Sequence, residues 1–397
     1  MKIISVVGAR PNFMKIAPFI RAIDKYNKKQ TPLLKERGQG GEVIQHLLLH
    51  TGQHYDQRMS STFFTQLGIP QPDINLEIGS GTHAEQVGQT MIAFEKVLQT
   101  EKPDWVVVVG DVNATLACSV TAKKEGIKCC HIEAGLRSGD MFMPEEINRL
   151  VTDRLSDLLL TPDKMSSENL RKEGTPENKI VFVGNIMIDT LEFNRQKAAA
   201  LSFNEIIKTN AIHTSPSPLE RGLEGEAPYG LITMHRPSNV DDKQILESII
   251  NWFITDAANQ IPLIWPIHPR TVKQLQSFGL WQSLLDCKNI VLLHPLGYLD
   301  MLKLNMNAKV MLTDSGGLQE ECCVLGTPFL TLRWNTERPV TLLEHGGAGY
   351  LVGNNIENIS RDFNKIMHEK RTPKIPELWD GNAAQRCINA ILNYKAF

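Results

Sequence analysis

The sequence predicts an α/β protein made of two doubly wound domains, each built on a parallel sheet. Short runs of β-branched residues alternate with longer amphipathic stretches, which is the pattern of repeated βα units. These runs form two groups, separated by a segment rich in Pro, Ser and Gly at 209–228. A chain of 397 residues is long enough for two domains of ordinary size.

The expected strands are spaced so that a helix fits between each pair. They are 2–7, 43–50, 105–110, 127–132, 157–161 and 180–183 in the first half, and 230–233, 263–267, 290–293, 310–313 and 328–332 in the second. A further helix is expected over 187–207. The domain boundary is predicted at Gly184-Asn185, which gives domains of 1–184 and 185–379.

Two segments depart from this alternation and resemble each other. Residues 31–42 and 215–227 share a Glu-Arg-Gly theme, are rich in glycine and charge, and have no apolar periodicity. Such segments bury too little apolar surface to order themselves. We therefore interpret both as loop insertions that take no part in the chemistry.

The composition argues against several classes of partner. The net charge is only −2, so no sequence-wide field favours nucleic acid or an anionic membrane. The first apolar run, 3–7, is too short for a signal peptide, and no run approaches the ~18 apolar residues of a membrane helix. Seven cysteines without a CxxC spacing are typical of reduced, buried thiols. We expect a cytoplasmic protein with no nucleic-acid or membrane partner.

The first functional motif follows the first predicted strand. Gly8 lies at the expected turn, where the missing Cβ lets a ligand approach the backbone. Arg10 and Lys15 lie near the start of a helix expected from about Phe13, whose free amides favour an anion. The motif is neither GxGxxG nor a Walker loop, so neither nicotinamide nor ATP is expected as a cofactor.

An acidic group follows two consecutive strands. Asp111 and Glu133 come directly after 105–110 and 127–132, and neighbouring parallel strands lie ~5 Å apart, so the two carboxyls are expected to share one crevice. Mutual repulsion would favour retention of a proton by one of them, which suits acid/base work. Glu145 begins the next helix, with Arg149 four residues later on the same predicted face. Helix capping is the alternative role for Asp111 and Glu145.

The second half carries groups suited to a diphosphate and a ribose. His235 and His268 each end a strand beside arginines, and such donors bind anionic oxygens. Ser315, Gly316 and Gly317 lead from a strand into a helix, with exposed amides, and Glu321 lies one turn further on. Arg338 supplies another cation. The sequence contains no HxxxH, HxH or CxxC spacing, so no metal is expected.

Taken together, these motifs resemble those of the non-hydrolysing UDP-N-acetylglucosamine 2-epimerases. The resemblance is carried in order from about residue 1 to 390 by Gly8-Ala9-Arg10-Pro11, Gly110-Asp111, His131-Ile132-Glu133-Ala134-Gly135-Leu136-Arg137, Pro144-Glu145-Glu146-Ile147-Asn148-Arg149, His235-Arg236, Asp314-Ser315-Gly316-Gly317 and Thr336-Glu337-Arg338-Pro339. It implies a GT-B architecture of two Rossmann-like domains that face a cleft. A last helix, within about 380–397, would return to the first domain, and a homodimer is expected.

The resemblance also implies the reaction, which is inversion at carbon 2 of UDP-N-acetylglucosamine by elimination and re-addition of UDP. It makes Asp111, Glu133 and Glu145 the acid/base set, with His235 at the diphosphate. It assigns UDP binding to Arg10, Lys15, Ser315, Gly316, Gly317, Glu321 and Arg338, and support of the sugar and carboxylates to Arg137 and Arg149. His268 is added as a substrate-binding residue. No cofactor is implied.

One departure from the family pattern, one further resemblance and two other functions bear on this assignment. Regulated bacterial members carry a Gln-His-Arg segment, whereas this chain has Gln53-His54-Tyr55, which argues against an allosteric site. The short link 139–143 and the tripeptide Asp111-Val112-Asn113 resemble the corresponding segments of relatives that act on UDP-2,3-diacetamido-glucuronate. A GT-B glycosyltransferase would use the same UDP cradle but need an acceptor, and a silent binding protein would have no use for the three carboxylates.

Overall fold

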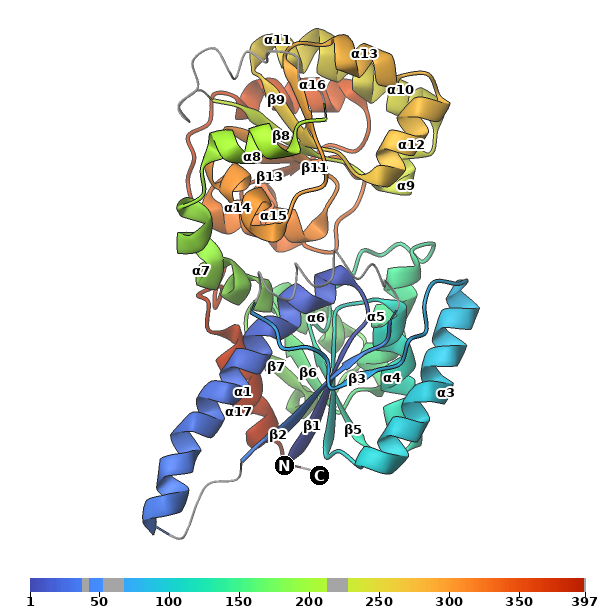
Figure 1. The fold of residues 1–397 in the computed structure, drawn as a ribbon, viewed down its shortest axis with the longest axis vertical. Helices are drawn as coiled ribbons and strands as arrows, with labels where there is room; N and C mark the ends of the chain where they lie inside the picture. The colour runs from blue at the N-terminus through green and yellow to red at the C-terminus, as the bar shows by residue number, and fades with distance from the viewer. Residues whose placement is uncertain (38–42, 53–67, 213–227, 396–397) are drawn as a thin grey trace. The chain divides into compact units, whose positions relative to one another are not determined.

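The computed structural model describes residues 1–37, 43–52, 68–212 and 228–395, and the chain divides into two compact units (Figure 1). Unit 1 comprises Met1–Phe193 and Glu377–Phe397, and unit 2 comprises Asn194–Pro376. The division falls within helix α7 (Ile186–Ala199), whereas the sequence placed the boundary just before this helix.

The C-terminal segment is anchored on unit 1 by a buried carboxylate. Asp189 on α7 accepts hydrogen bonds from the backbone N–H groups of Ala383 (3.0 Å) and Ala384 (2.8 Å). These amides begin α17 (Ala383–Leu392), whose N-cap residue makes no side-chain cap of its own. Asp189 therefore satisfies the free amides of that helix end.

Unit 1 is a parallel sheet with helices on both faces. Its strands have the order β3-β2-β1-β4-β5-β6-β7 and are β1 (Lys2–Val7), β2 (Gln45–His50), β3 (Ile74–Asn75), β4 (Trp105–Val109), β5 (Lys128–Ile132), β6 (Leu158–Thr161) and β7 (Ile180–Phe182). Besides α7 and α17, its helices are α1 (Arg10–Arg37), α3 (His83–Glu101), α4 (Asn113–Lys124), α5 (Pro144–Leu155), α6 (Lys164–Lys172) and the 3₁₀ turn η1 (Glu177–Lys179). All five residues of the central strand β4 are buried, as expected for a sheet covered on both faces.

Unit 2 repeats this architecture. The strand order is β10-β9-β8-β11-β12-β13, with β8 (Gly230–Thr233), β9 (Leu263–Pro266), β10 (Ile290–Leu293), β11 (Val310–Thr313), β12 (Phe329–Thr331) and β13 (Gly349–Leu351), all parallel. The helices are α8 (Phe203–Asn210), α9 (Pro237–Val240), α10 (Lys243–Trp252), the π-turn η3 (Phe253–Ala257), α11 (Ala258–Gln260), α12 (Pro269–Ser277), α13 (Trp281–Asp286), α14 (Tyr298–Asn307), α15 (Gly316–Leu325), η4 (Pro339–Thr341), η5 (Leu343–His345) and α16 (Ile356–Ile366).

Each sheet has one point at which the strand order reverses. In unit 1 the chain leaves β1 towards β2 and returns to the other side of β1 at β4. In unit 2 the same reversal separates β8 from β11. The loops that follow these strands diverge, and this opening at the carboxyl ends is where doubly wound sheets bind ligands. The motifs identified in the sequence follow these strands and three of their neighbours, β5, β9 and β12.

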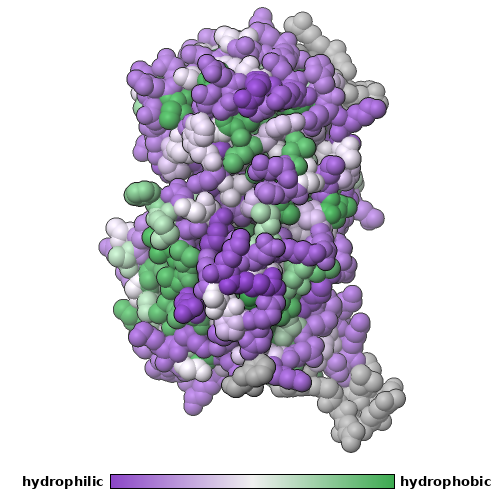
Figure 2. All heavy atoms as spheres, turned by 180° about the vertical axis from the view of Figure 1, so that it is seen from behind, coloured by the Kyte–Doolittle hydropathy of each residue, from purple (hydrophilic) through white to green (hydrophobic). Residues whose placement is uncertain are grey.

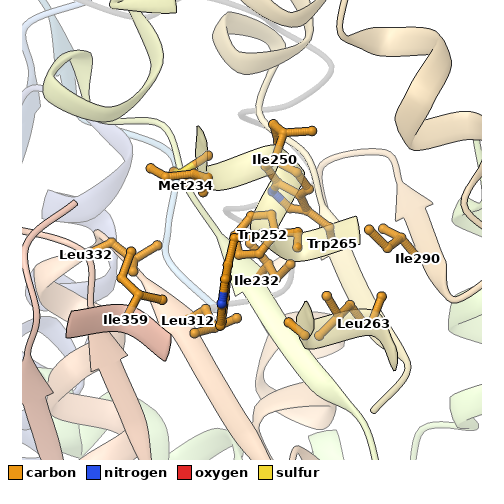
Figure 3. Close-up of a cluster of buried hydrophobic side chains, with 14 of the residues drawn as sticks. Ile232, Met234, Ile250, Trp252, Leu263, Trp265, Ile290, Leu312, Leu332 and Ile359 are labelled. Carbon is orange, nitrogen blue, oxygen red and sulfur yellow. The ribbon is translucent and has the colours of Figure 1, made fainter. Parts of the chain in front are cut away.

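The core of unit 2 fixes the strand ends next to the candidate site. Ile232 on β8, Leu312 on β11 and Trp265 on β9 lie in one buried cluster with Met234 and Leu332 (Figure 3). Met234 immediately precedes His235 and is 1% exposed. Packing around Met234 therefore holds the start of the loop that carries this histidine.

The structure adds elements that the sequence did not predict and corrects three others. The edge strands β3 and β13 were missed, and the helix expected over 187–207 is two helices, α7 and α8. Helix α1 begins at Arg10, before Phe13, because proline is well accommodated in a first turn.

The interpretation of 31–42 as a loop insertion is wrong for its first part. Helix α1 continues to Arg37, since Leu33-Leu34-Lys35-Glu36-Arg37 consists of strong helix formers. The second segment, 215–227, lies outside the described residues. No helix in the described part of the chain is long and apolar enough to span a membrane.

Candidate active site

In unit 1, a buried ion pair lies beside the reversal point. Lys15 on α1 pairs with Glu133, which follows β5, and both side chains are buried. A Cβ added to Gly110 would lie 3.1 Å from the Lys15 Nζ and 3.5 Å from the Glu133 Oε2, so the glycine leaves room for this pair. Glu133 has a φ of 72°, which is strained for a residue with a side chain and is typical of functional sites.

Asn12 shapes the turn after β1. Its side-chain oxygen accepts from the backbone N–H groups of Gly8 (3.4 Å) and Ala9 (3.0 Å), and its amide donates to the carbonyl of Val109 (2.7 Å). This residue links the ends of β1 and β4 and was not singled out from the sequence. Arg10 is the first residue of α1, and its side chain lies outside what the structure describes.

Asp111 and Arg149 form a second ion pair. The Nη1 of Arg149 lies 2.7 Å from the Asp111 Oδ2, and the Nη2 of Arg149 lies 2.8 Å from the Glu146 Oε2. Arg149 therefore pairs with Glu146, three residues earlier on α5, a partner that the sequence analysis missed. Glu146 also accepts from the N–H groups of Ser138 and Gly139, which fixes the loop before α5.

Asp111 and Glu145 are not the N-cap residues of α4 and α5. The N-cap residues of α4 and α5 are Val112 and Met143, neither with a side-chain cap, and Glu145 lies partly buried in the first turn of α5. Asp111 and Glu133 follow paired strands, and each has its own cation. These cations offset the repulsion that was expected between the two carboxylates.

Arg137 has protein partners. Its Nη1 lies 2.7 Å from the Asp153 Oδ2 and its Nε lies 2.7 Å from the Glu173 Oε1. Burial acts against the charge of Arg137, but Glu173 and Asp153 raise the pKa of its guanidinium above its usual range. These contacts hold the loop that follows Glu133.

In unit 2, Asp314 organises the reversal point. Its Oδ2 accepts from the backbone N–H groups of His235 (2.9 Å) and Arg236 (2.8 Å), and its Oδ1 lies 3.1 Å from the His235 Nδ1. Burial works against the ionised form, but the contacts from His235 and Arg236 hold the pKa of Asp314 below its usual range. The His268 ring lies 5.4 Å from that of His235, so the structure brings these two histidines together.

Helix α15 presents free amides at the end of β11. Its N-cap residue, Ser315, makes no side-chain cap, and Gly316 and Gly317 form the first turn. A Cβ on Gly316 would lie 2.6 Å from the Arg338 Nη1 and 2.7 Å from the Glu337 Oε1, so a larger residue there would displace this ion pair. Uncapped N–H groups at a helix start form an anion site.

Arg338 lies in a buried network of charges. Its Nε donates to Glu320 (2.6 Å) and its Nη1 to Glu337 (2.5 Å), and Arg333 donates to the same Glu337 (2.8 Å). All four side chains are buried. Arg338 therefore braces the start of α15 against the loop after β12.

Glu321 is a fully buried carboxyl on α15. Burial raises its pKa to about 7, and the neighbouring Glu320 acts in the same direction, against hydrogen bonds from Tyr298 and Asn305 on α14. The carboxyl therefore titrates close to neutral pH.

This titration predicts a pH-dependent stability. The folded pKa of about 7 exceeds the ordinary 4.5, so the folded state binds the extra proton and stability falls as pH rises between these values. At 1.36 kcal/mol per unit the loss reaches about 3 kcal/mol. Glu321→Gln should remove this component from urea-unfolding free energies measured between about pH 4.5 and pH 8. Glu95→Gln, at an exposed position on α3, is the control for replacing a carboxylate by an amide. An unchanged pH dependence of the unfolding free energy in Glu321→Gln would contradict the raised pKa of Glu321.

The expectations about an allosteric site and about a metal stay predictions. The Gln53-His54-Tyr55 segment lies outside the described residues. Within the described ranges, no group of three or more His, Cys, Asp or Glu side chains could hold a metal ion.

The comparisons with known proteins agree with this architecture. A family model described as UDP-N-acetylglucosamine 2-epimerase matches residues 38–392. The UDP-N-acetylglucosamine 2-epimerase of Methanocaldococcus jannaschii is 41% identical over 99% of both chains. Its crystal structure in complex with UDP-GlcNAc and UDP has 40% identity, full coverage of both chains and a TM-score of 0.85.

A relative named for a different substrate is almost as similar. The UDP-2,3-diacetamido-2,3-dideoxy-D-glucuronate 2-epimerase of Pseudomonas aeruginosa is 38% identical over 89% of this chain and 88% of its own. The match of the family model, the identities over the full chain and the two parallel α/β units of GT-B type lead to one assignment. The chain belongs to the UDP-N-acetylglucosamine 2-epimerase family.

Proposed function

We propose that this protein interconverts UDP-N-acetylglucosamine and UDP-N-acetylmannosamine. The observation that carries the proposal is the set of carboxylates at the reversal point of unit 1, where Glu133 pairs with Lys15 and Asp111 pairs with Arg149. The M. jannaschii relative, whose structure holds UDP-GlcNAc and UDP, supports this substrate class.

The chemistry of the sugar requires such carboxylates. The C2 proton is not acidic, so the route proceeds by removal of that proton as the C1–O bond to UDP breaks, giving a 2-acetamidoglucal. UDP then adds back to C1 while a proton is delivered to C2 on the opposite face. A base and an acid are therefore needed on the two faces of the ring, and we assign Asp111, Glu133 and Glu145 to these steps.

The nucleotide is assigned to unit 2. The free amides of Gly316 and Gly317, with Ser315, His235 and His268, would hold the diphosphate as negative charge develops on leaving UDP. Glu321 would accept from the ribose hydroxyls. Arg10 and Lys15 are likewise assigned to UDP as cations. The contacts of Arg137, Arg149 and Arg338 with protein carboxylates indicate that these arginines act mainly by holding the site.

Solvent exchange tests the elimination route. In deuterated water, with UDP-N-acetylglucosamine and no acceptor, the product should carry deuterium at C2, because the incoming proton comes from an exchangeable carboxyl. NMR of the sugar resonances measures this incorporation. Complete retention of the original hydrogen would contradict elimination, and turnover that depends on an acceptor would favour a glycosyltransferase.

A second substrate is favoured by two observations. The relative named for UDP-2,3-diacetamido-glucuronate is 38% identical to this chain, and the short link 139–143 before α5 resembles that expected of such relatives. Parallel incubation with both sugar nucleotides, followed by NMR, decides between them. The preferred substrate is the one with the higher kcat/KM.

We also propose that the protein forms a homodimer through α3 and α5. Ile92 on α3, Ile147 on α5, and Met141 and Phe142 in the preceding loop are exposed apolar side chains of unit 1. Figure 2 shows apolar surface gathered on the flank of unit 1 where these helices lie. An area of this kind is typical of an interface between copies.

The dimer is testable by light scattering after size exclusion. Ile92→Glu should weaken self-association about tenfold or more, because it places a charge within the apolar interface. Ile375→Glu is the matched control, since Ile375 is equally exposed (62% against 61% for Ile92) but lies in unit 2. A monomeric wild type, or equal effects of the two variants, would contradict the interface.

A further inference from the structure

A histidine that the proposed mechanism does not use lies buried between the elements that carry all three candidate carboxylates. His131 on β5 is 0% exposed. Its Nδ1 lies 2.6 Å from the Asp153 Oδ1 on α5, and its Nε2 lies 2.9 Å from the carbonyl oxygen of Gly110, just after β4. Both ring nitrogens are therefore within hydrogen-bond distance of an oxygen.

Both of these oxygens are acceptors. A peptide carbonyl cannot donate, so the Nε2 must carry a proton. The second oxygen of Asp153 accepts from the N–H of Gly135 (3.0 Å) and pairs with the Arg137 Nη1 (2.7 Å), which is the environment of an ionised carboxylate. Burial opposes that ionisation, but His131 and Arg137 hold the pKa of Asp153 below its usual range.

We propose that His131 is a positioning residue, an imidazolium whose two N–H groups link Asp153 to the carbonyl of Gly110. Charges then alternate along a chain of four side chains, His131, Asp153, Arg137 and Glu173. A neutral ring has only one N–H and would lose one of the two contacts.

These contacts link the elements that bear the candidate carboxylates. Gly110 immediately precedes Asp111, and His131 lies two residues before Glu133 on the neighbouring strand. Asp153 lies on α5, whose first turn carries Glu145. One charged ring thus fixes the relative positions of the three groups, a role that rests on the proposed epimerase function.

The charge of His131 can be measured directly. In protein labelled with ¹⁵N-histidine, the His131 resonances are identified by their absence in His131→Asn. At about pH 7.5 we expect both ring nitrogens to be protonated, with no substrate present. A ring nitrogen without a proton overturns the inference. This measurement needs neither turnover nor a variant of Asp153, so it decides the charge even if the epimerase assignment fails.

The positioning role is tested by Asp153→Asn. The variant removes the charge that stabilises the imidazolium, so kcat should fall on the order of 10–100-fold with a smaller change in KM, because the reacting groups are misplaced while the nucleotide still binds. The ¹⁵N spectrum of the same variant should show a neutral ring. Asp157→Asn is the matched control.

Asp157 holds the other end of the same sheet. It pairs with Lys123 and accepts from the N–H of Cys129, at the opposite end of β5 from Glu133. The Asp157→Asn variant should retain the wild-type kcat and a charged His131. If the Asp153→Asn variant folds, has a neutral His131 and still has a normal kcat, His131 has no positioning role. If the wild type has a charged His131 but no epimerase activity, only the epimerase assignment is refuted.

Discussion

Glu133→Gln is expected to reduce kcat by about 10²–10⁴-fold, the usual contribution of a general acid or base. Gln has the same size and can still accept from Lys15, so the geometry of the buried pair is retained. It cannot exchange a proton with C2 of the sugar. The affinity for UDP, measured by calorimetry, should change little because Lys15 is retained and most of the nucleotide contacts are assigned to unit 2.

A matched exchange separates this effect from a general loss of negative charge. Glu125→Gln removes an exposed carboxylate at the end of α4 and should retain wild-type kcat. Because an amide in place of the Glu133 carboxylate leaves the Lys15 ammonium less compensated, thermal unfolding of Glu133→Gln should be measured alongside. Normal turnover in a folded Glu133→Gln variant would show that Glu133 has no acid/base role.

The fold class could be predicted because buried parallel strands are continuous apolar runs. Trp105–Val109 and Leu158–Leu160 are of this kind, and the structure contains both as strands. The missed strands, Ile74–Asn75 and Gly349–Leu351, have two and three residues and lie at sheet edges. So short a segment has no periodicity to detect, and its pairing depends on the neighbouring strand.

The sequence predicts which strand ends carry the site residues, but it does not predict which side chains those residues contact. Glu133 and Asp314 directly follow strands and Asp111 lies two residues after β4, so their location was available from the sequence. Arg149 contacts Glu146, whereas a spacing of four residues had favoured Glu145. Both i+3 and i+4 neighbours share a helix face, so the spacing does not choose between them. In the structure, Glu146 also accepts from the N–H groups of Ser138 and Gly139.

Arg338 is a second residue whose partners could not be predicted from the sequence. The sequence assigned it to the nucleotide as a cation in a loop, whereas the structure places its guanidinium between Glu320 and Glu337. A loop arginine and a buried one are indistinguishable without the tertiary contacts. Loss of UDP binding after its removal would therefore not by itself identify a ligand contact.

Arg338→Ala is expected to lower the free energy of unfolding by about 3–5 kcal/mol, the cost of breaking a buried ion pair. Arg338 is 5% exposed, and its removal leaves Glu320 buried without the cation to which it is hydrogen-bonded. Glu337 retains Arg333, so the larger part of the loss should come from Glu320. Urea unfolding monitored by tryptophan fluorescence measures the change.

Two further variants identify the cause of that loss. Glu320→Gln introduced into Arg338→Ala removes the buried charge of Glu320 and should restore part of the stability, since an amide is less costly to bury than a carboxylate. Arg361→Ala breaks the pair with Asp362 on α16, where the arginine side chain is 57% exposed, and should cost less than about 1 kcal/mol. If Arg338→Ala costs no more than Arg361→Ala, or if Glu320→Gln gives no recovery, the network does not brace α15. Arg338 would then be available for the nucleotide after all.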